Sequence, residues 1–307
     1  MRSMLNVGHN YMCNIPFWVW RKLIMNLHSK PSIAFALAAI LLLTAFVCGC
    51  TDSGPAPAET ETISVTGSTT VLPLAQIAAE AYMGNYPDAD IQVSGGGSSV
   101  GVTAVGEGTA EIGMASRELK SSESEAYPDL VQHVVAKDAI AIIVNPSNTV
   151  ADLTIAQIKS IYLGDTTNWK DVGGPDAVIV VVGRDSASGT REYFLESVMD
   201  KEDFTPGQLE KNSNGAVRQT VAQTPGAIGY VGLGYLDGSV KAVPVNTGSG
   251  TVEASVATVL SGEYPIARGL NMFTVGEPTG LAADYISFIM SPDGQALVTE
   301  EGYVPIV

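Results

Sequence analysis

Short β-branched apolar runs recur along the chain, and each is followed by a Gly, Ser and Thr loop and then by a helical pattern. Four such units begin at Ile63, Ile91, Glu111 and Val178, and the third has the weakest pattern. Apolar runs that end at turn residues predict buried strands. Strand–loop–helix units in series predict an α/β fold with mainly parallel sheets. We therefore expect the four loops at the carboxyl ends of strands, where sheets of this kind bind ligands.

Other segments fit the same fold. Residues 138–146 (DAIAIIVNP) predict a buried strand that ends at a proline. A helix is predicted between Thr154 and Gly164, because Thr154 and Gln157 have the spacing of a capping box and the glycine is placed to end the helix. The C-terminal segment, residues 283–307, predicts two short helices and then a terminal strand.

The first 49 residues differ from the rest of the chain. Their apolar run, residues 33–47, follows the basic Lys30 and is shorter than the roughly 20 residues that span a bilayer. This pattern is typical of a secretory signal. Cys50 comes after a small residue just beyond the run, as in a lipoprotein cleavage site, so we expect it to carry a lipid. The alternatives are an ordinary signal cleaved elsewhere and an uncleaved anchor. Residues 1–24 are interpreted as residues added because the start codon was assigned too early.

Charge and residue counts exclude several classes of function. The leader holds four basic residues and no acid, so the remaining chain carries 12 Lys and Arg against 32 Asp and Glu, a formal charge of −20. Such a surface repels nucleic acid and anionic lipid. After the leader, Cys50 is the only cysteine and His133 the only histidine, which excludes an intrachain disulfide and a His/Cys metal cluster. We therefore predict no cofactor and no metal.

The loop GRDSASGT, residues 183–190, raises three possibilities: a nucleotide phosphate site, a nucleophilic serine, or a site for a free anion. A nucleotide P-loop needs a lysine, which none of the four loops contains. A serine nucleophile needs a base, but His133 lies at a predicted strand entry and no GxSxG pattern surrounds Ser188. Paired carboxylates stay open in so acidic a chain. The loop chemistry favours anion binding without catalysis.

The four loops suit a small tetrahedral oxyanion. The first N–H groups of a helix have no internal partner, and the helix dipole adds positive charge there. Glycine lets the backbone approach a ligand, and Ser and Thr add hydroxyl donors. Arg184 and Arg117 lie in two of the loops, and a guanidinium offers a planar fork of donors that matches two anion oxygens. We expect Asp185 to orient Arg184. A surface ion pair is the alternative role of both arginines.

Beyond the signal and the lipid cysteine, the motifs follow one another in a specific order: GSTTVLPL, GGGSSVG, IGMASREL, GRDSASGTREYF, YPIARGLNMF and SPDGQALVTEEGYVPI. This ordered set covers nearly all of residues 62–307 and resembles the phosphate-binding proteins that supply phosphate ABC transporters. The resemblance implies a two-lobed fold of the type II periplasmic-binding-protein class, in which two hinge crossings join lobes that are mainly parallel sheets flanked by helices.

The resemblance also implies domain boundaries. After the leader, residues 1–49, comes a tether rich in Pro, Ala and acid at residues 50–61. Lobe I would combine residues 62–140 and 268–307, and lobe II would be residues 141–267. The protein would be a monomer that binds inorganic phosphate and delivers it to ABC permease subunits. It would be held by its lipid on the extracytoplasmic face of the cell membrane and would have no enzyme activity.

The phosphate would lie between the lobes, and the resemblance places binding residues in all four loops. Carried over position by position, these residues are Thr69, Thr70, Val71 through its amide, Ser98, Ser99, Ser116, Arg117, Arg184, Ser188, Gly189 and Thr190.

One position departs from the family. Many members carry a third-loop aspartate that accepts a hydrogen bond from protonated phosphate, and Ser116 and Arg117 occupy its place here. A buried acceptor favours phosphate, which carries an O–H near neutral pH, over sulfate, which carries none. Selectivity would then need another acceptor, such as Asp185 or a backbone carbonyl. The alternatives are therefore a binding protein for sulfate, molybdate or tungstate and, in a different class, a cell-surface phosphohydrolase.

Overall fold

The computed structural model of the chain describes residues 60–306. The expected leader, the expected lipid attachment at Cys50 and nearly all of the expected tether lie outside the described residues. Within residues 60–306, no helix combines the length and the apolar character needed to cross a membrane.

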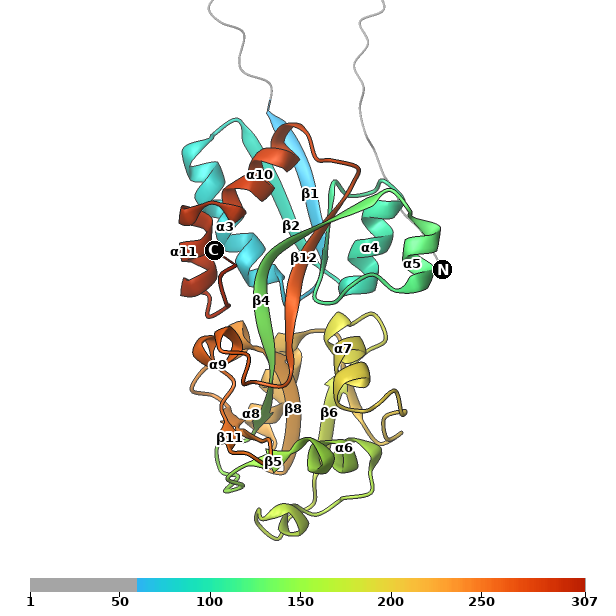
Figure 1. Ribbon diagram of the computed structural model, residues 1–307, viewed down its shortest axis with the longest axis vertical. Coiled ribbons are helices and arrows are strands. Elements are labelled where there is room, and N and C mark those ends of the chain that lie inside the picture. Colours follow the sequence, from blue (N-terminus) through green and yellow to red (C-terminus); the bar gives the residue numbers. More distant parts are fainter. Residues whose placement is uncertain (1–59, 307) are drawn as a thin grey trace, which may run out of the picture. The chain divides into compact units, whose positions relative to one another are not determined.

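Residues 60–306 form two lobes joined by two long strands (Figure 1). The main hydrogen-bonded path of strands runs β2–β1–β3–β12–β4–β8–β6–β7, with β9 paired to β4, and β5, β10 and β11 form a small second sheet. The strands of this main sheet are β1 (Glu61–Gly67), β2 (Ala89–Gly95), β3 (Ile112–Ala115), β4 (Leu130–Val144), β6 (Val180–Arg184), β7 (Leu209–Lys211), β8 (Ala227–Gly232), β9 (Lys241–Val243) and β12 (Ala267–Val275). Those of the second sheet are β5 (Leu153–Thr154), β10 (Val245–Asn246) and β11 (Thr251–Val252).

Helices flank the strands in both lobes. The first lobe contains β1 to β3 with α3 (Leu72–Asn85), α4 (Ser98–Gly106), α5 (Ser121–Ala126), α10 (Gly280–Met290) and α11 (Pro292–Glu300). The second lobe contains β5 to β11 with α6 (Ile155–Leu163), α7 (Gly189–Ser197), α8 (Asn214–Gln223) and α9 (Val256–Leu260). In Figure 1 the first lobe therefore combines the blue and green start of the described chain with its red end.

Strands β4 and β12 cross between the lobes. The first part of β4 pairs antiparallel with β12 in the first lobe, and its last residues, Ile140 to Val144, pair antiparallel with β8 in the second. The pairs β1–β2, β1–β3, β6–β7 and β6–β8 are parallel. Each lobe thus has a parallel group of strands next to an antiparallel crossing, as the fold class predicts. The expected boundaries near residues 140 and 267 stay predictions.

Each lobe has its own buried apolar core. In the first lobe, Leu74 of α3 and Tyr285 of α10 pack against strand residues such as Ile112. In the second lobe, Phe194 of α7 stacks on Tyr230 of β8, with ring centroids 4.3 Å apart. Separate cores allow each lobe to stay rigid while the crossings bend.

Most of the predicted elements are confirmed. All four strand–loop–helix units are present, and Thr154 and Gln157 form a reciprocal capping box on α6, which ends at Gly164 in the left-handed conformation. The predicted terminal strand is wrong. Val304 makes an isolated bridge to Lys137, and Pro305 follows it. A proline has no N–H to continue a ladder, which explains why no strand extends beyond the bridge.

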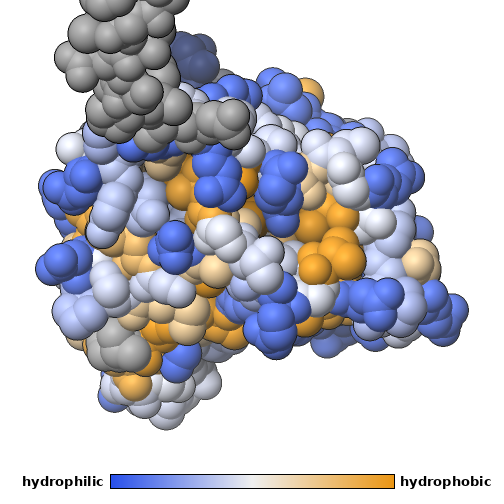
Figure 2. Space-filling view, turned by 90° about the horizontal axis from the view of Figure 1, so that it is seen from above, coloured by the Kyte–Doolittle hydropathy of each residue, from blue (hydrophilic) through white to orange (hydrophobic). Residues whose placement is uncertain are grey.

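The surface carries few large exposed hydrophobic residues. Figure 2 looks onto the first lobe from above and shows hydrophilic residues over much of this face, with smaller hydrophobic areas between them. Exposed apolar residues such as Tyr86, Val100 and Val275 come from different elements. Apolar residues exposed in this way are normal on soluble domains and indicate no binding surface by themselves.

Candidate functional site

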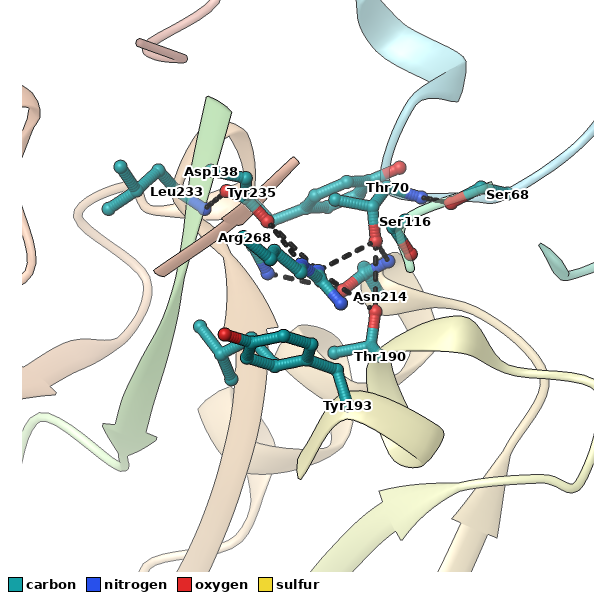
Figure 3. Close-up of polar contacts among 12 residues, drawn as sticks. Ser68, Thr70, Ser116, Asp138, Thr190, Tyr193, Asn214, Leu233, Tyr235 and Arg268 are labelled. Atoms are coloured by element: carbon teal, nitrogen blue, oxygen red, sulfur yellow. Dashed lines mark hydrogen bonds and ion pairs between the residues drawn. The ribbon is translucent and has the colours of Figure 1, made fainter. Parts of the chain in front are cut away.

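Five loops from the two lobes meet at one buried cluster of polar side chains. The loops after β1, β2 and β3 come from the first lobe, and those after β6 and β7 come from the second. Thr70 Oγ1 of the first lobe lies 3.0 Å from Thr190 Oγ1 of the second. The amide nitrogen of Asn214 donates to Thr69 Oγ1 at 3.1 Å and to Thr70 Oγ1 at 3.0 Å. We call Thr69, Thr70, Thr190 and Asn214 the hydroxyl–amide cluster, and Figure 3 labels the last three of them.

The loop after β1 has a conformation that requires glycine at its start. Gly67 has φ +135°, and a Cβ there would overlap the carbonyl oxygen of Met114. Past this glycine, Ser68 Oγ accepts a hydrogen bond from the N–H of Thr70 at 3.2 Å. The turn is fixed further by Tyr303, whose hydroxyl donates to the Thr70 carbonyl at 2.6 Å. The sequence thus holds Thr70 at the entry of α3 before any ligand arrives.

Backbone donors at two helix starts remain without partners. The N–H groups of Val71, Gly189 and Thr190 have no hydrogen-bond acceptor among residues 60–306. Val71 is the N-cap of α3, and Gly189 and Thr190 open α7. Ser188 caps α7 by accepting the N–H of Arg191 at 3.2 Å, which leaves its hydroxyl proton to be donated. Unpaired N–H groups at helix starts, where the dipole is positive, are suited to an anion.

The two lobes approach each other closely beside this cluster. Ser99 N–H donates to the Ala187 carbonyl at 3.1 Å, and a Cβ on Gly97 would lie 2.6 Å from the same oxygen. A Cβ on Gly189 would overlap Ser98 Oγ. Ser98 Oγ in turn accepts the Ser116 N–H at 3.1 Å. Glycine at these positions lets the backbone of one lobe lie directly against the other lobe beside the cluster.

Arg184 is buried, and no acidic side chain of residues 60–306 bonds its guanidinium. Its Nε donates to the Lys211 carbonyl at 3.1 Å and its Nη2 to the Asn212 carbonyl at 3.2 Å. Nη1 makes no hydrogen bond to the described residues. Burial lowers the pKa of Arg184, and Arg268 adds to this effect, whereas Tyr230 and Asp185 oppose it. Because carbonyl oxygens are neutral, Arg184 keeps its positive charge available for an anion.

The expected role of Asp185 is wrong in one respect. Within the described residues its carboxylate makes neither a hydrogen bond nor an ion pair with Arg184, and its Oδ1 has no partner. The carbonyls of Lys211 and Asn212 orient the guanidinium instead. The reason is geometric, because β6 and β7 pair in parallel and bring the loop after β7 against Arg184.

Arg117 lies near the cluster, but its guanidinium points elsewhere. Nη1 and Nη2 each donate to Glu123 at 2.7 Å in a bidentate pair, and Nη2 also donates to Ser99 Oγ at 3.0 Å. The pair is not the surface ion pair considered from the sequence, because the side chains of Arg117 and Glu123 are 4% and 13% exposed. Arg117 therefore lies beside the cluster, and its guanidinium binds Glu123 of α5. Its expected contact with the anion stays a prediction.

Arg268 of β12 was missed from the sequence, although it lies in the quoted motif YPIARGLNMF. Its Nη2 donates to Thr70 Oγ1 at 3.3 Å and to Thr190 Oγ1 at 3.1 Å, so one nitrogen contacts both lobes (Figure 3). Its Nη1 is buried and has no partner among the described residues. The sequence signal for Arg268 was a single basic residue within an apolar strand pattern. Arg268 is therefore the arginine that hydrogen-bonds the cluster directly.

Asn214 was also missed. It follows the short strand β7, which has only three residues and no β-branched run to mark it. Ser213 caps α8, so Asn214 opens a fifth helix start at the cluster. Its Oδ1 accepts the Gly232 N–H at 3.3 Å, which fixes the amide so that its nitrogen faces the threonines. The signal was the sequence NSNGAV, a fifth loop of cap residues before a helix.

The one histidine of the described residues lies in a strand ladder. His133 hydrogen-bonds Thr274 Oγ1 at 2.9 Å in the β4–β12 ladder of the first lobe, and burial lowers its pKa. Residues 60–306 hold no group of three His, Cys, Asp or Glu that could bind a metal. The cluster can bind and enclose an anion, and nothing in it is arranged to activate a nucleophile.

The chain is similar to proteins of one family over most of its length. A family model described as a PBP superfamily domain matches residues 53–293. The phosphate-binding protein PstS of Bacillus subtilis (strain 168) is 36% identical over 285 residues, which cover 89% of this chain and 93% of that protein. The phosphate-binding protein PstS of Pseudomonas aeruginosa PAO1 is 33% identical over 267 residues, which cover 80% of this chain and 83% of that protein.

Solved structures have the same fold. A Clostridium perfringens crystal structure, described as a phosphate ABC transporter substrate-binding protein with bound phosphate, has 39% sequence identity and a TM-score of 0.76. It covers 80% of this chain and 100% of its own. An ABC-type phosphate transport receptor from Vibrio cholerae has 33% identity and a TM-score of 0.65, and covers 79% of this chain and 99% of its own.

Proposed function

Because the chain belongs to the PBP superfamily, and within it to the family of the phosphate-binding proteins named above, we propose that it binds inorganic phosphate and delivers it to an ABC permease for import. The observation that carries this proposal is the buried cluster, where hydroxyls and unpaired N–H groups of both lobes lie around Arg268, with the buried Arg184 in the same loop as Ser188 and Thr190. A small oxyanion is bound well by fixed dipoles and by two cations that are shielded from solvent.

Each group at the cluster has a definite part in binding. The N–H groups of Val71, Gly189 and Thr190 would donate to phosphate oxygens from two helix starts, as would the Ser188 hydroxyl. Further hydroxyls would either donate to phosphate or hold the donating groups in place: those of Thr69, Thr70, Ser98, Ser99, Ser116 and Thr190. Arg184 would supply a charge-assisted hydrogen bond through Nη1. Because donors come from both lobes, the ligand stabilises the closed arrangement over an open one.

The wider biological role is part of the same proposal. The protein would be a monomer held outside the cytoplasm by a lipid on Cys50, and its ABC permease would receive phosphate when the lobes open. It would turn over no substrate, because the cluster offers donors and cations but no base next to a hydroxyl. Sulfate, molybdate and tungstate are the competing ligands of the same shape.

Calorimetric titration of the purified protein with phosphate, sulfate, molybdate and tungstate tests the proposal. We expect phosphate to bind with the highest affinity and to raise the melting temperature as its concentration rises, because it stabilises the folded state. Tighter binding of another oxyanion would reassign the ligand. Steady phosphate release from monoesters that Ser188→Ala abolishes would instead establish a phosphohydrolase.

Removal of Arg117 should affect stability more than affinity. Burial alone would raise the pKa of Glu123, but hydrogen bonds from Arg117 and from the Lys120 N–H outweigh it and lower that pKa. The pair therefore stabilises the fold above the ordinary pKa of glutamate, and this contribution is lost as the pH falls through the lowered value. We expect Arg117→Ala to lower the free energy of unfolding at neutral pH by about 3 kcal/mol. Denaturant melts measure this.

Phosphate affinity distinguishes the two roles of Arg117. If the Arg117 guanidinium binds Glu123 and not the ligand, Arg117→Ala and Glu123→Ala should both leave phosphate affinity within roughly threefold of wild type. A loss of about a hundredfold in Arg117→Ala alone would place Arg117 among the phosphate ligands after all.

A further inference from the structure

A buried carboxylate lies next to the cluster at the crossing of β4 and β12. Asp138 is fully buried, and it is directly opposite Arg268 in the antiparallel ladder. Its Oδ2 accepts from Nη2 of Arg268 at 2.9 Å and from Nε at 3.2 Å, and its Oδ1 accepts the Leu233 N–H at 2.8 Å. The same Nη2 contacts Thr70 and Thr190 (Figure 3), so a single guanidinium nitrogen separates the carboxylate from the site hydroxyls.

This pair determines the charge of the site. Asp138 cancels the charge of Arg268, whereas Arg184 contacts neutral carbonyls alone among the described residues. Within the described residues Asp185 makes no hydrogen bond or ion pair with Arg184 or with the cluster, although its charge acts on Arg184 from a distance. At the cluster itself Asp138 and Arg268 therefore cancel, and buried Arg184 at the end of β6 adds a surplus of one positive charge. An anion of charge minus one would be balanced, but a dianion would leave one buried negative charge uncompensated.

The surroundings of Asp138 allow it to take up a proton. It faces Arg268 of β12, the phenols of Tyr264 and Tyr303 that enter its electrostatic surroundings, and the N–H groups of Leu233 and Ala139. Burial raises the pKa of Asp138, and Arg268 and the two N–H groups oppose this effect without overcoming it. A second negative charge brought within a few ångströms would disfavour the ionised carboxylate further.

We propose that Asp138, through Arg268, makes the site accept phosphate together with one proton and reject the sulfate dianion. The inference rests on the proposed function and deepens it. The proton is held either by phosphate, bound as the monoanion, or by Asp138 beside the dianion; the total charge is the same. Asp138 would thus provide, from a strand that crosses between the lobes, the selectivity for which the third loop has no acid.

Proton counting on the wild-type protein is the first test. Titrations with phosphate in two buffers of different ionisation enthalpy give the number of protons taken up on binding. Near pH 6, where phosphate is mainly the monoanion, little uptake is expected, and near pH 9 uptake should approach about one proton per phosphate. Phosphate affinity should fall correspondingly as the pH rises. Tight binding near pH 9 without proton uptake would overturn the inference.

Three matched variants separate charge balance from other roles. Asp138→Asn leaves Arg268 uncompensated, so sulfate affinity should rise by at least about tenfold relative to phosphate, and proton uptake near pH 9 should fall by about one. Glu123→Gln removes the partner of the other buried arginine, and Asp185→Asn removes the other nearby acid. Both should keep the wild-type selectivity and proton count within roughly twofold.

The outcomes are distinct from those of the proposed function. If wild type binds no phosphate, the proposed function fails first. If it binds phosphate tightly but Asp138→Asn weakens phosphate and sulfate equally with unchanged proton uptake, Asp138 merely positions Arg268 and the inference fails alone. A selectivity change in Asp185→Asn instead would assign the role to Asp185. If Asp138→Asn does not fold, the proton count of wild type decides the question.

Discussion

Arg184→Ala should weaken phosphate binding by about a hundredfold or more. The guanidinium is fully buried, two of its nitrogens are fixed by carbonyls, and Nη1 with its charge is left for the ligand. A charge-assisted hydrogen bond contributes roughly 1.5–3 kcal/mol, and Nη1 carries two N–H donors. Arg184→Lys should recover part of the loss, because an ammonium restores the charge but cannot reach the same acceptors. Isothermal titration calorimetry measures both affinities.

Lys159→Ala is the control for Arg184→Ala. It makes the same change in net charge, but Lys159 lies on α6 and pairs with the exposed Asp200 and Glu202. We expect its phosphate affinity to stay within roughly threefold of wild type, since exposed ion pairs contribute little. Wild-type affinity in Arg184→Ala would rule out the site as a whole.

Gly97→Ala should prevent the lobes from closing. The added Cβ would lie 2.6 Å from the Ala187 carbonyl oxygen of the other lobe, and this neighbour is a backbone atom and not the end of a flexible side chain. Overlap of this kind costs about 1–3 kcal/mol, so we expect phosphate affinity to fall by about tenfold or more. Wild type should become more compact in solution scattering when phosphate is added, because the ligand bridges the lobes. Gly97→Ala should show a smaller change at saturating phosphate.

Gly108→Ala is the matched control for Gly97→Ala. Both glycines have positive φ, +104° and +70°, so both substitutions strain the backbone, but a Cβ on Gly108 meets nothing within 4 Å. Equal losses of affinity in the two variants would mean that backbone strain, and not contact between lobes, is responsible. Identical scattering of wild type with and without phosphate would remove the closing motion while leaving the site itself.

Local patterns in the sequence were enough to predict the four loops. Glycine, serine and threonine after β-branched runs specify a strand end and a helix start within about ten residues, so the units from Ile63 to Val178 needed no long-range information. The capping box at Thr154 is equally local. The polar ends of these units lie at the cluster or beside it, and their contacts with an anion stay predictions.

The partners of charged residues could not be predicted in the same way. Asp138 and Arg268 are 130 residues apart, and they meet because of the register between β4 and β12, which no local pattern reveals. Arg117 lies in a loop that suits an anion, but its guanidinium forms a bidentate ion pair with Glu123, the third residue of α5. The Arg117 guanidinium points toward the Glu123 carboxylate because that acceptor lies within hydrogen-bond distance.

The insertion of β12 between β3 and β4 has a consequence for how the chain acquires its structure. The sheet of the first lobe stays incomplete until residue 275 has been synthesised, since β3 has no other neighbour on that side. Contacts such as Asn271 with the Arg117 carbonyl close a loop of 154 residues. Contacts so distant in sequence form slowly, because the entropy of loop closure must be overcome before they stabilise anything. The second lobe is built from one continuous stretch, so it is expected to fold first and to bring the two ends of the other lobe together.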